Sequence, residues 1–202
     1  MPAKKKIKEY QTALFLEEIQ KRITVPEGQY EKFLALWEPK EFKRNEFILK
    51  AGEVPKFSMF VLKGCMRQYI VNEKGEESIV YFAEERHWLG DLAAMRSKVS
   101  TTFNYQAIED CELLVISAEN WERAFVEFPW WTVAHLTGFQ KWAAKMQQEL
   151  ADKNTLTGEV RYLTLLKERP TLFQRVPQHY IASYLGISPE TLSRIRKKIY
   201  NI

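Results

Sequence analysis

Hydrophobic and polar residues follow two different spacings in the first 117 positions of the chain. Tyr10–Trp37 has the three- and four-residue spacing of helices, interrupted at Val25–Gly28. Residues 40–117 instead contain short runs rich in Phe, Tyr, Val and Ile, separated by turn residues, which predicts strands. The predicted strands are Glu46–Lys50, Ser58–Leu62, Met66–Val71, Ser78–Phe82, Thr101–Ala107 and Glu112–Ile116. Many short strands at this spacing are typical of a barrel, sandwich or jelly roll.

Helical spacing returns after the predicted strands. A short helix is expected over Ala118–Phe128 and a longer one over Pro129–Asp152, where the proline suits a first helical turn. The longer helix carries three tryptophans and an apolar stripe formed by Val133, Leu136, Phe139 or Gln140, Ala143, Met146 and Leu150. Packing against the chain's own β domain is one explanation. The seam-like spacing favours pairing with the same helix of a second copy.

The most informative stretch is Val176–Ile199. Before it, Thr157–Lys167 has helical spacing and Leu172–Val176 is a candidate strand. Within it, a helix over residues 178–185 ends at Gly186, which supplies the left-handed residue of a tight turn. Ser188 and Pro189 then suit the N-cap and first position of a second helix. Two short helices joined in this way predict a helix-turn-helix, with a generic helical hairpin as the alternative.

The second helix has an apolar inner face and a basic outer face. Arg194 suits a bidentate contact with guanine, and Glu190 suits the cytosine amino group, whereas Arg196 and the neighbouring lysines suit phosphates. A solvated helix surface is the alternative for each residue. The predicted DNA-binding residues are Gln178, Ser188, Pro189, Glu190, Thr191, Ser193, Arg194, Lys197 and Lys198.

Charge agrees with a polyanion partner at this end of the chain. The net charge is only +4, but residues 153–202 hold nine Lys and Arg against three Asp and Glu.

Several short sequence motifs resemble those of the Crp/Fnr transcription regulators. Gly186-Ile187-Ser188, Glu190-Thr191 and Ser193-Arg194-Ile195 resemble that family's turn and recognition helix. Lys50-Ala51-Gly52-Glu53, Phe60-Val61-Leu62-Lys63-Gly64 and Trp88-Leu89-Gly90-Asp91 resemble its β-roll, so the resemblance covers about residues 14–200. It implies an α+β fold with an N-terminal double-stranded β-helix (a jelly-roll or cupin-like β-roll), a long dimerisation helix and a C-terminal winged helix-turn-helix. The corresponding domains are residues 1–128, 129–152 and 153–202.

The resemblance also implies a function. The protein is expected to be a homodimeric transcription regulator, not an enzyme, that reads an inverted-repeat operator through the helix at residues 188–199. Expected partners are double-stranded DNA and a second copy of the chain, with a small-molecule effector and RNA polymerase as candidates. Pro189 stands where well-known DNA readers of the family carry a basic residue, so a different operator is expected. The alternative is a ligand-binding β-roll module without sequence-specific DNA binding.

One position of the sequence argues against a cyclic nucleotide as the effector. In the family's nucleotide-binding members, a Gly-Glu pair holds the ribose, and an arginine just before a Ser or Thr pairs with the cyclic phosphate. The matching positions, and the candidate effector residues, are Gly90, Asp91, Leu92, Ser100 and Thr101. Val99 occupies the arginine's place, which removes a charge-assisted bidentate pair. We therefore expect no tight cyclic-nucleotide binding and no cofactor.

Composition limits the remaining functions. Cys65 and Cys111 are too few for an iron–sulfur cluster or a four-cysteine metal site, and the three histidines fall in separate predicted elements. We therefore expect no metal and no catalytic residues, which argues against a cupin-type enzyme. No run of 18 apolar residues predicts a membrane span, and no apolar run follows the basic N-terminus as in a secretory signal. A cytoplasmic location is expected.

Overall fold

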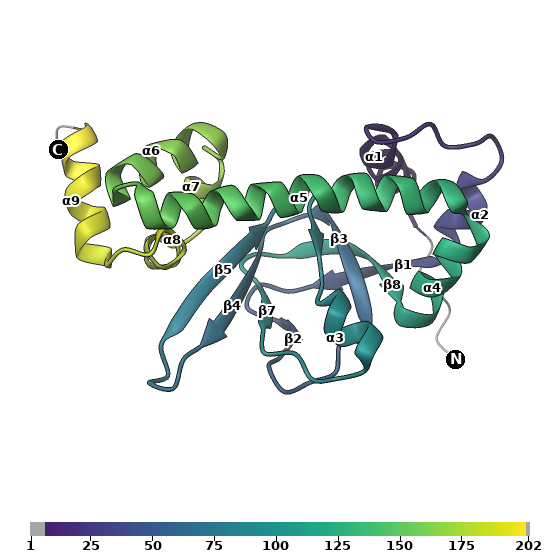
Figure 1. The fold of residues 1–202 in the computed structure, drawn as a ribbon, viewed down its shortest axis with the longest axis horizontal. Helices are drawn as coiled ribbons and strands as arrows, with labels where there is room; N and C mark the ends of the chain where they lie inside the picture. Colours follow the sequence, from purple (N-terminus) through teal and green to yellow (C-terminus); the bar gives the residue numbers. More distant parts are fainter. Residues whose placement is uncertain (1–6, 201–202) are drawn as a thin grey trace.

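The computed structural model describes residues 7–200, and its centre is a β-roll made of two four-stranded antiparallel sheets (Figure 1). One sheet has the strand order β1 (Trp37–Phe42), β8 (Cys111–Ser117), β3 (Phe57–Lys63) and β6 (Trp88–Leu89). The other has the order β2 (Phe47–Leu49), β7 (Asn104–Ala107), β4 (Met66–Val71) and β5 (Glu77–Ala83). The predicted α+β class with an N-terminal β-roll is confirmed.

Apolar side chains from both sheets fill the space between them. Met59 of β3, Leu89 of β6 and Tyr105 of β7 each have at most 6% of their surface exposed. Because inward and outward side chains alternate along a strand, the apolar positions of each strand meet in this layer.

The N-terminal helices close one end of the roll through aromatic packing. These are α1 (Glu9–Gln20) and α2 (Tyr30–Leu34), joined there by α4 (Ala118–Glu127) and the start of α5 (Pro129–Thr155). Phe15, Phe33, Trp37 and Trp131 are almost fully buried, with ring centroids 4.8–6.3 Å apart. Trp130 is also buried here. Two of the three tryptophans of the long helix therefore belong to the chain's own core.

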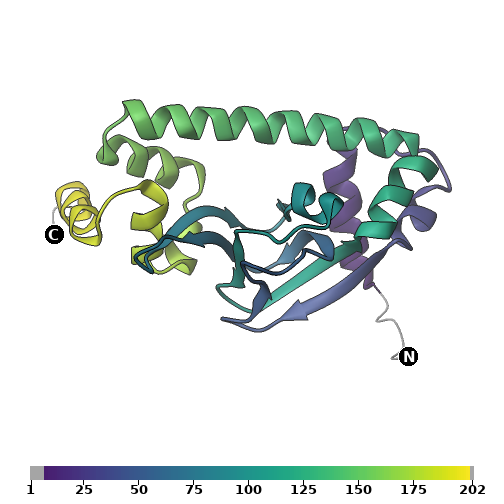
Figure 2. The same cartoon turned by 60° about the horizontal axis from the view of Figure 1, so that its bottom comes forward.

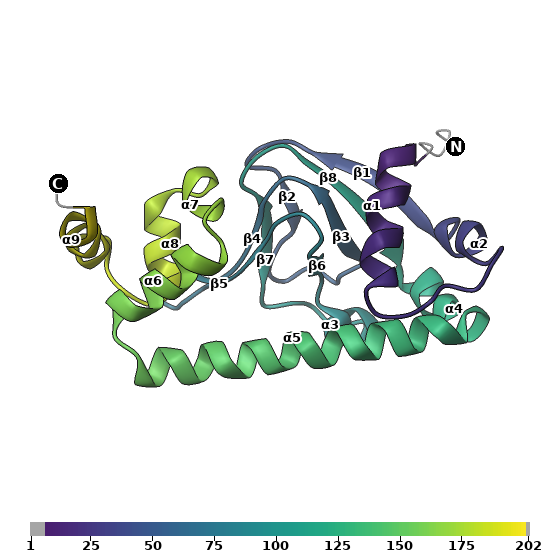
Figure 3. The same ribbon diagram turned by 90° about the horizontal axis from the view of Figure 1, so that it is seen from above.

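Helix α5 is the longest element and runs along most of the length of the molecule, with the sheets on one side of it (Figure 3). Its inner face holds Trp131 and Ala134, both buried. Away from this inner face, large apolar side chains are about half exposed, namely Val133, Leu136, Phe139 and Leu150. Trp142 is also about half exposed, but it follows Trp131 by eleven residues, or three helical turns, and so lies on the same side of the helix as Trp131. Met146 packs partly against the β-roll core instead. The predicted stripe is thus present, and most of it is uncovered.

The C-terminal part contains four helices: α6 (Gly158–Glu168), α7 (Leu172–Arg175), α8 (Gln178–Leu185) and α9 (Pro189–Tyr200). The prediction of a strand at Leu172–Val176 is wrong. Leu172 and Val176 are both buried, and their spacing of four residues places them on one face of a helical turn. Residues 118–200 contain no strand, so the predicted wing is not present in this part of the chain.

Helix α8 lies against the edge of the β-roll, beside β5 (Figure 2). The Ser183 hydroxyl accepts a hydrogen bond from the backbone N–H of Ile79 (3.0 Å) and donates one to the carbonyl of Glu77 (3.2 Å). It thereby satisfies backbone groups of an edge strand, which would otherwise be open to pairing. The guanidinium of Arg67 stacks on Tyr180, with 4.0 Å between its central carbon and the ring centroid.

Two arginine side chains, Arg169 and Arg175, extend this contact between the C-terminal part of the chain and the roll. Arg169 donates to the carboxylate of Glu84 (2.8 Å) and to the carbonyl of Phe82 (3.0 Å). Arg175 makes a bidentate pair with Glu85, at 2.8 Å for both hydrogen bonds. These contacts hold the C-terminal helices against the chain's own β-roll in this structure.

Candidate DNA-binding surface

The turn between α8 and α9 has the geometry of a helix-turn-helix. Gly186 ends α8 with φ of +65°, a left-handed conformation that favours glycine. The N–H groups of Gly186 and Ile187 donate to the carbonyls of Ser183 and Ala182, both at 3.0 Å. The Ser188 hydroxyl accepts from the N–H of Thr191 (3.2 Å) and so caps α9. The predicted pair of helices and their tight turn are confirmed.

Packing between the two helices decides which residues face solvent. Ile181, Ala182 and Leu185 of α8 and Leu192 and Ile195 of α9 are all buried. The small side chain of Ala182 allows the helices to approach closely. The outer face of α9 is left uncovered by the other described residues, at the end of the molecule farthest from the N-terminus (Figure 1).

The predicted DNA-binding residues collect on this uncovered face, with one exception. Thr191 is half-buried, and exposed residues on α9 or its cap are Ser188, Pro189, Glu190, Ser193, Arg194, Lys197 and Lys198. Gln178 is also exposed, but it lies at the start of α8 and not on α9. The structure therefore brings together all of the predicted residues except Gln178.

Two of the basic residues on this face already have partners within the protein. Lys198 forms an ion pair with Glu159 of α6, with 2.8 Å and 2.9 Å from its Nζ to the two carboxylate oxygens. Arg194 uses one nitrogen, Nη2, to reach the Thr191 hydroxyl (3.2 Å), which leaves its other donors free for a ligand.

Glu190 is a carboxylate at neutral pH. A hydrogen bond from Ser188, followed by one from the helix backbone, lowers the pKa of Glu190 below its ordinary value. A carboxylate accepts hydrogen bonds only, which suits a base that presents an amino group.

The candidate effector residues are used by the protein itself. One carboxylate oxygen of Asp91 accepts from the N–H of Ala94 (3.0 Å) and caps α3 (Leu92–Ser97). The other accepts from the Thr101 hydroxyl (2.8 Å). Gly90 lies so close to β3 that an added Cβ would stand 3.1 Å from the Ser58 hydroxyl. Leu92 is partly buried as the first residue of α3, and Ser100 is exposed.

These residues do not fit a cyclic nucleotide. Val99 is 53% exposed and has no group for a phosphate, and each oxygen of the Asp91 carboxylate already accepts a hydrogen bond from within the protein. The interior of the roll beside them is filled by Tyr105, which is fully buried.

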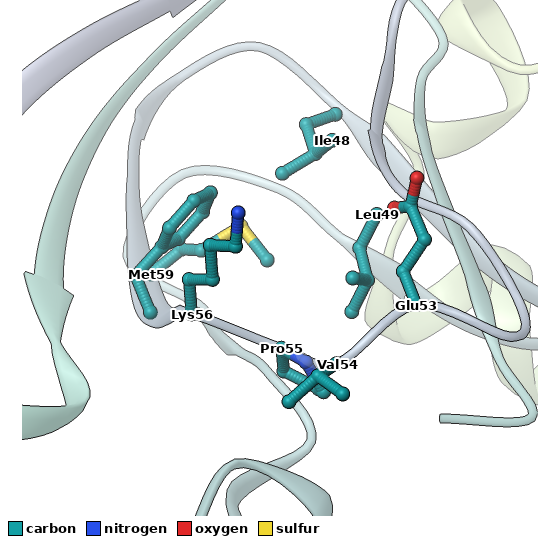
Figure 4. Close-up of a pocket in the computed structure, with 8 residues that line it drawn as sticks. Ile48, Leu49, Glu53, Val54, Pro55, Lys56 and Met59 are labelled. Carbon is teal, nitrogen blue, oxygen red and sulfur yellow. The ribbon is translucent and has the colours of Figure 1, made fainter. Parts of the chain in front are cut away.

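A pocket of about 410 Å³ lies elsewhere in the roll, at the connection between β2 and β3 (Figure 4). None of the five candidate effector residues lines it. Its lining is largely apolar, with Glu53 and Lys56 as the charged members, and consists of Ile48, Leu49, Glu53, Val54, Pro55, Lys56, Phe57 and Met59.

The histidines are placed apart. Burial, followed by the charge of Arg169, lowers the pKa of His87, and burial, followed by the charge of Arg22, lowers that of His135. His179 stacks on Tyr180 at the start of α8. Among residues 7–200, no group of three or more His, Cys, Asp or Glu side chains is arranged to hold a metal ion.

Over the same residues, no helix combines the length and apolar character needed to cross a bilayer.

Comparison with known proteins gives one family match and many matches in fold. Residues 39–127 match the cyclic nucleotide-binding domain family. No curated protein sequence matches the chain.

Solved structures match along most of the chain. CLP, a c-di-GMP-responsive global regulator of Xanthomonas campestris, is 19% identical, with 87% of this chain and 92% of CLP covered and a TM-score of 0.70. FixK2 of Bradyrhizobium japonicum is 19% identical, covering 82% and 85%, with a TM-score of 0.68. A variant of CooA from Carboxydothermus hydrogenoformans is 16% identical, covering 84% and 79%, with a TM-score of 0.64. At these identities the likeness establishes the fold.

Proposed function

Because residues 39–127 belong to the cyclic nucleotide-binding domain family and the chain has the fold of the Crp/Fnr regulators, we propose that it is a homodimeric transcription regulator that binds DNA through α9. The outer face of α9 is the observation that carries the proposal. It is exposed, it is held by a capped and closely packed helix pair, and it carries Glu190, Arg194 and Lys197 in successive turns. A helix of this kind fits the major groove of DNA.

Base reading is assigned to two residues of this face. Arg194 is the donor for guanine, because a guanidinium matches the two acceptors of that base. Glu190 is the acceptor for the amino group of cytosine. Lys197 and Arg196 contact phosphates, whereas Lys198 reaches a phosphate only after leaving Glu159.

Dimerisation is assigned to α5. Its face opposite the β-roll leaves Val133, Leu136 and Leu150 more than half exposed, at spacings that form a coiled-coil seam. A seam of two parallel α5 helices would place both copies of α9 at the same end of the dimer. Such a dimer reads two half-sites about one DNA turn, roughly 34 Å, apart.

The β-roll is proposed to act without a cyclic nucleotide. The Asp91 carboxylate accepts a hydrogen bond from the Thr101 hydroxyl. Val99 occupies the position at which the family's nucleotide-binding members have an arginine. A different small-molecule effector would regulate DNA binding only if it bound more tightly to one of two conformations of the protein, which differ in the position of the DNA-binding helices.

An electrophoretic shift with genomic fragments and a salt titration tests the DNA-binding proposal. About four phosphate contacts per dimer predict that affinity falls roughly 100-fold between about 50 and 200 mM salt. A protein that retards no fragment at low salt would instead be the alternative, a β-roll module without DNA binding.

A further inference from the structure

The first turn of α6 contacts the helix-turn-helix at three places: the end of α8, the turn and the end of α9. Arg161 lies on this helix and directs its guanidinium at the last residue of α8. Its Nε and Nη2 donate to the carbonyl of Leu185, at 3.1 Å and 2.9 Å. That carbonyl belongs to the residue just before Gly186, where the chain turns toward α9.

The same guanidinium also holds the end of α5. Its Nη1 donates to the carbonyls of Lys153 (3.2 Å) and Leu156. Carbonyls at a helix C-terminus have no partner within the helix and carry partial negative charge, so a cation stabilises them. One side chain therefore ties the end of the proposed dimer helix to the turn of the DNA-binding unit.

Two neighbours of Arg161 complete the contact. Gly158 lies against the turn, where an added Cβ would stand 2.7 Å from Cγ2 of Ile187. Glu159 holds Lys198 in the last turns of α9 through the ion pair described above. The first turn of α6 therefore holds the end of α8, the α8–α9 connection and the end of α9.

We propose that Arg161 is a positioning residue that sets the direction of α9 relative to α5, and thereby the half-site spacing that the dimer accepts. The proposal rests on the proposed function. Arg161 itself is partly buried on α6 and its guanidinium is bonded to backbone carbonyls, so it is assigned no base contact. Its role is to fix the angle at which each α9 leaves the end of its α5.

The inference separates two properties of DNA binding. Base preference within a half-site comes from side chains on α9 and does not depend on Arg161. Preference for spacing depends on how rigidly two copies of α9 are held, because one inserted base pair moves a half-site by about 3.4 Å and rotates it around the duplex.

The test measures the affinity of the full-length protein for its selected inverted repeat and for versions with one base pair inserted or removed between the half-sites. The wild-type protein should discriminate strongly between them. In Arg161→Met, this discrimination should fall at least about tenfold, since several hydrogen bonds to a charged group are lost together. The base preference within each half-site should stay unchanged.

Two further variants control the result. Lys167→Met removes the same charge from an exposed position of α6 and should keep the wild-type discrimination. Arg161→Lys keeps the charge but cannot bridge Leu185 and the end of α5 in the same geometry. Its spacing discrimination should therefore lie between that of the wild-type protein and that of Arg161→Met. This variant also answers the question if Arg161→Met does not fold.

The outcomes are distinguishable. A wild-type protein that binds no DNA overturns the proposed function together with this inference. A wild-type protein that binds DNA, with Arg161 variants that keep full spacing discrimination, overturns the positioning role alone. An altered base preference in Arg161→Met would also contradict it, because Arg161 would then act on base reading.

Discussion

Arg194 and Lys197 are both exposed on the outer face of α9, but their predicted roles differ. Arg194→Ala should cost about 1–3 kcal/mol of binding free energy at one base position in each half-site and relax the preference there. Lys197→Ala should weaken all sequences about equally and reduce the salt dependence. Affinities for a set of operators with single base changes measure both effects. A uniform loss in Arg194→Ala would make Arg194 a phosphate contact.

His135 makes the stability of the protein depend on pH. It packs against Trp121 and Phe125, with ring centroids at 5.0 Å and 5.4 Å, and burial, followed by the charge of Arg22, lowers its pKa. Below about pH 6.5 the unfolded chain takes up a proton at this residue that the folded protein does not, so the free energy of unfolding falls as the pH drops through this range.

His135→Phe should therefore reduce the loss of stability between about pH 7.5 and pH 5.5. Denaturant unfolding at the two pH values measures it, and His179→Phe, at an exposed position, is the control. An unchanged pH dependence in His135→Phe would show that His135 does not contribute to it.

At the scale of elements, α5 has two opposite apolar faces with different tasks. Leu136→Glu places a charge in the exposed face and should convert the dimer to a monomer without unfolding it, because Leu136 is 53% exposed in the single chain. DNA affinity should fall with dimerisation. Sedimentation at micromolar concentration measures the change, with Lys141→Glu on the same helix as control. A wild-type protein that sediments as a monomer would contradict the seam.

The buried pair Arg169–Glu84 joins the α6–α7 connection to β5, with side chains only 8% and 10% exposed. Arg169→Met should lower the free energy of unfolding by about 3–5 kcal/mol, because it leaves the Glu84 carboxylate buried with fewer donors. Adding Glu84→Gln should recover part of the loss, since the uncompensated charge is then gone. Denaturant titration of the two variants provides the measurement. Equal stability of wild type and Arg169→Met would contradict this role.

Local sequence signals predicted some elements and missed others for identifiable reasons. The α8–α9 pair was predictable because Gly186, Ser188 and Pro189 determine the end of one helix and the start of the next through strictly local backbone preferences. Strand β1 was missed because Pro39 lies within it, which is tolerated since β1 is an edge strand. Helix α7 was taken for a strand because a short apolar run fits either structure until its burial is known.

At the scale of the whole molecule, the contacts that position the DNA-binding unit join residues far apart in the sequence. Ser183 bonds to Ile79 and Arg161 bonds to Leu185, at separations of 104 and 24 residues, and neither pair has a local sequence signature. The proposed role of Arg161 was therefore not predictable, because an arginine on an amphipathic helix is ordinarily interpreted as a solvent-exposed charge. The candidate effector residues were predictable only as a resemblance, and the internal pairing of Asp91 with Thr101 required the structure.

In vitro selection of double-stranded DNA by the full-length protein tests the central claim most directly. The account predicts an enriched inverted repeat whose half-site centres lie about one helical turn apart. It also predicts that selection with Arg194→Ala changes one position in each half-site and leaves the spacing unchanged. Recovery of no enriched sequence by the folded wild-type protein would contradict the claim that α9 reads DNA.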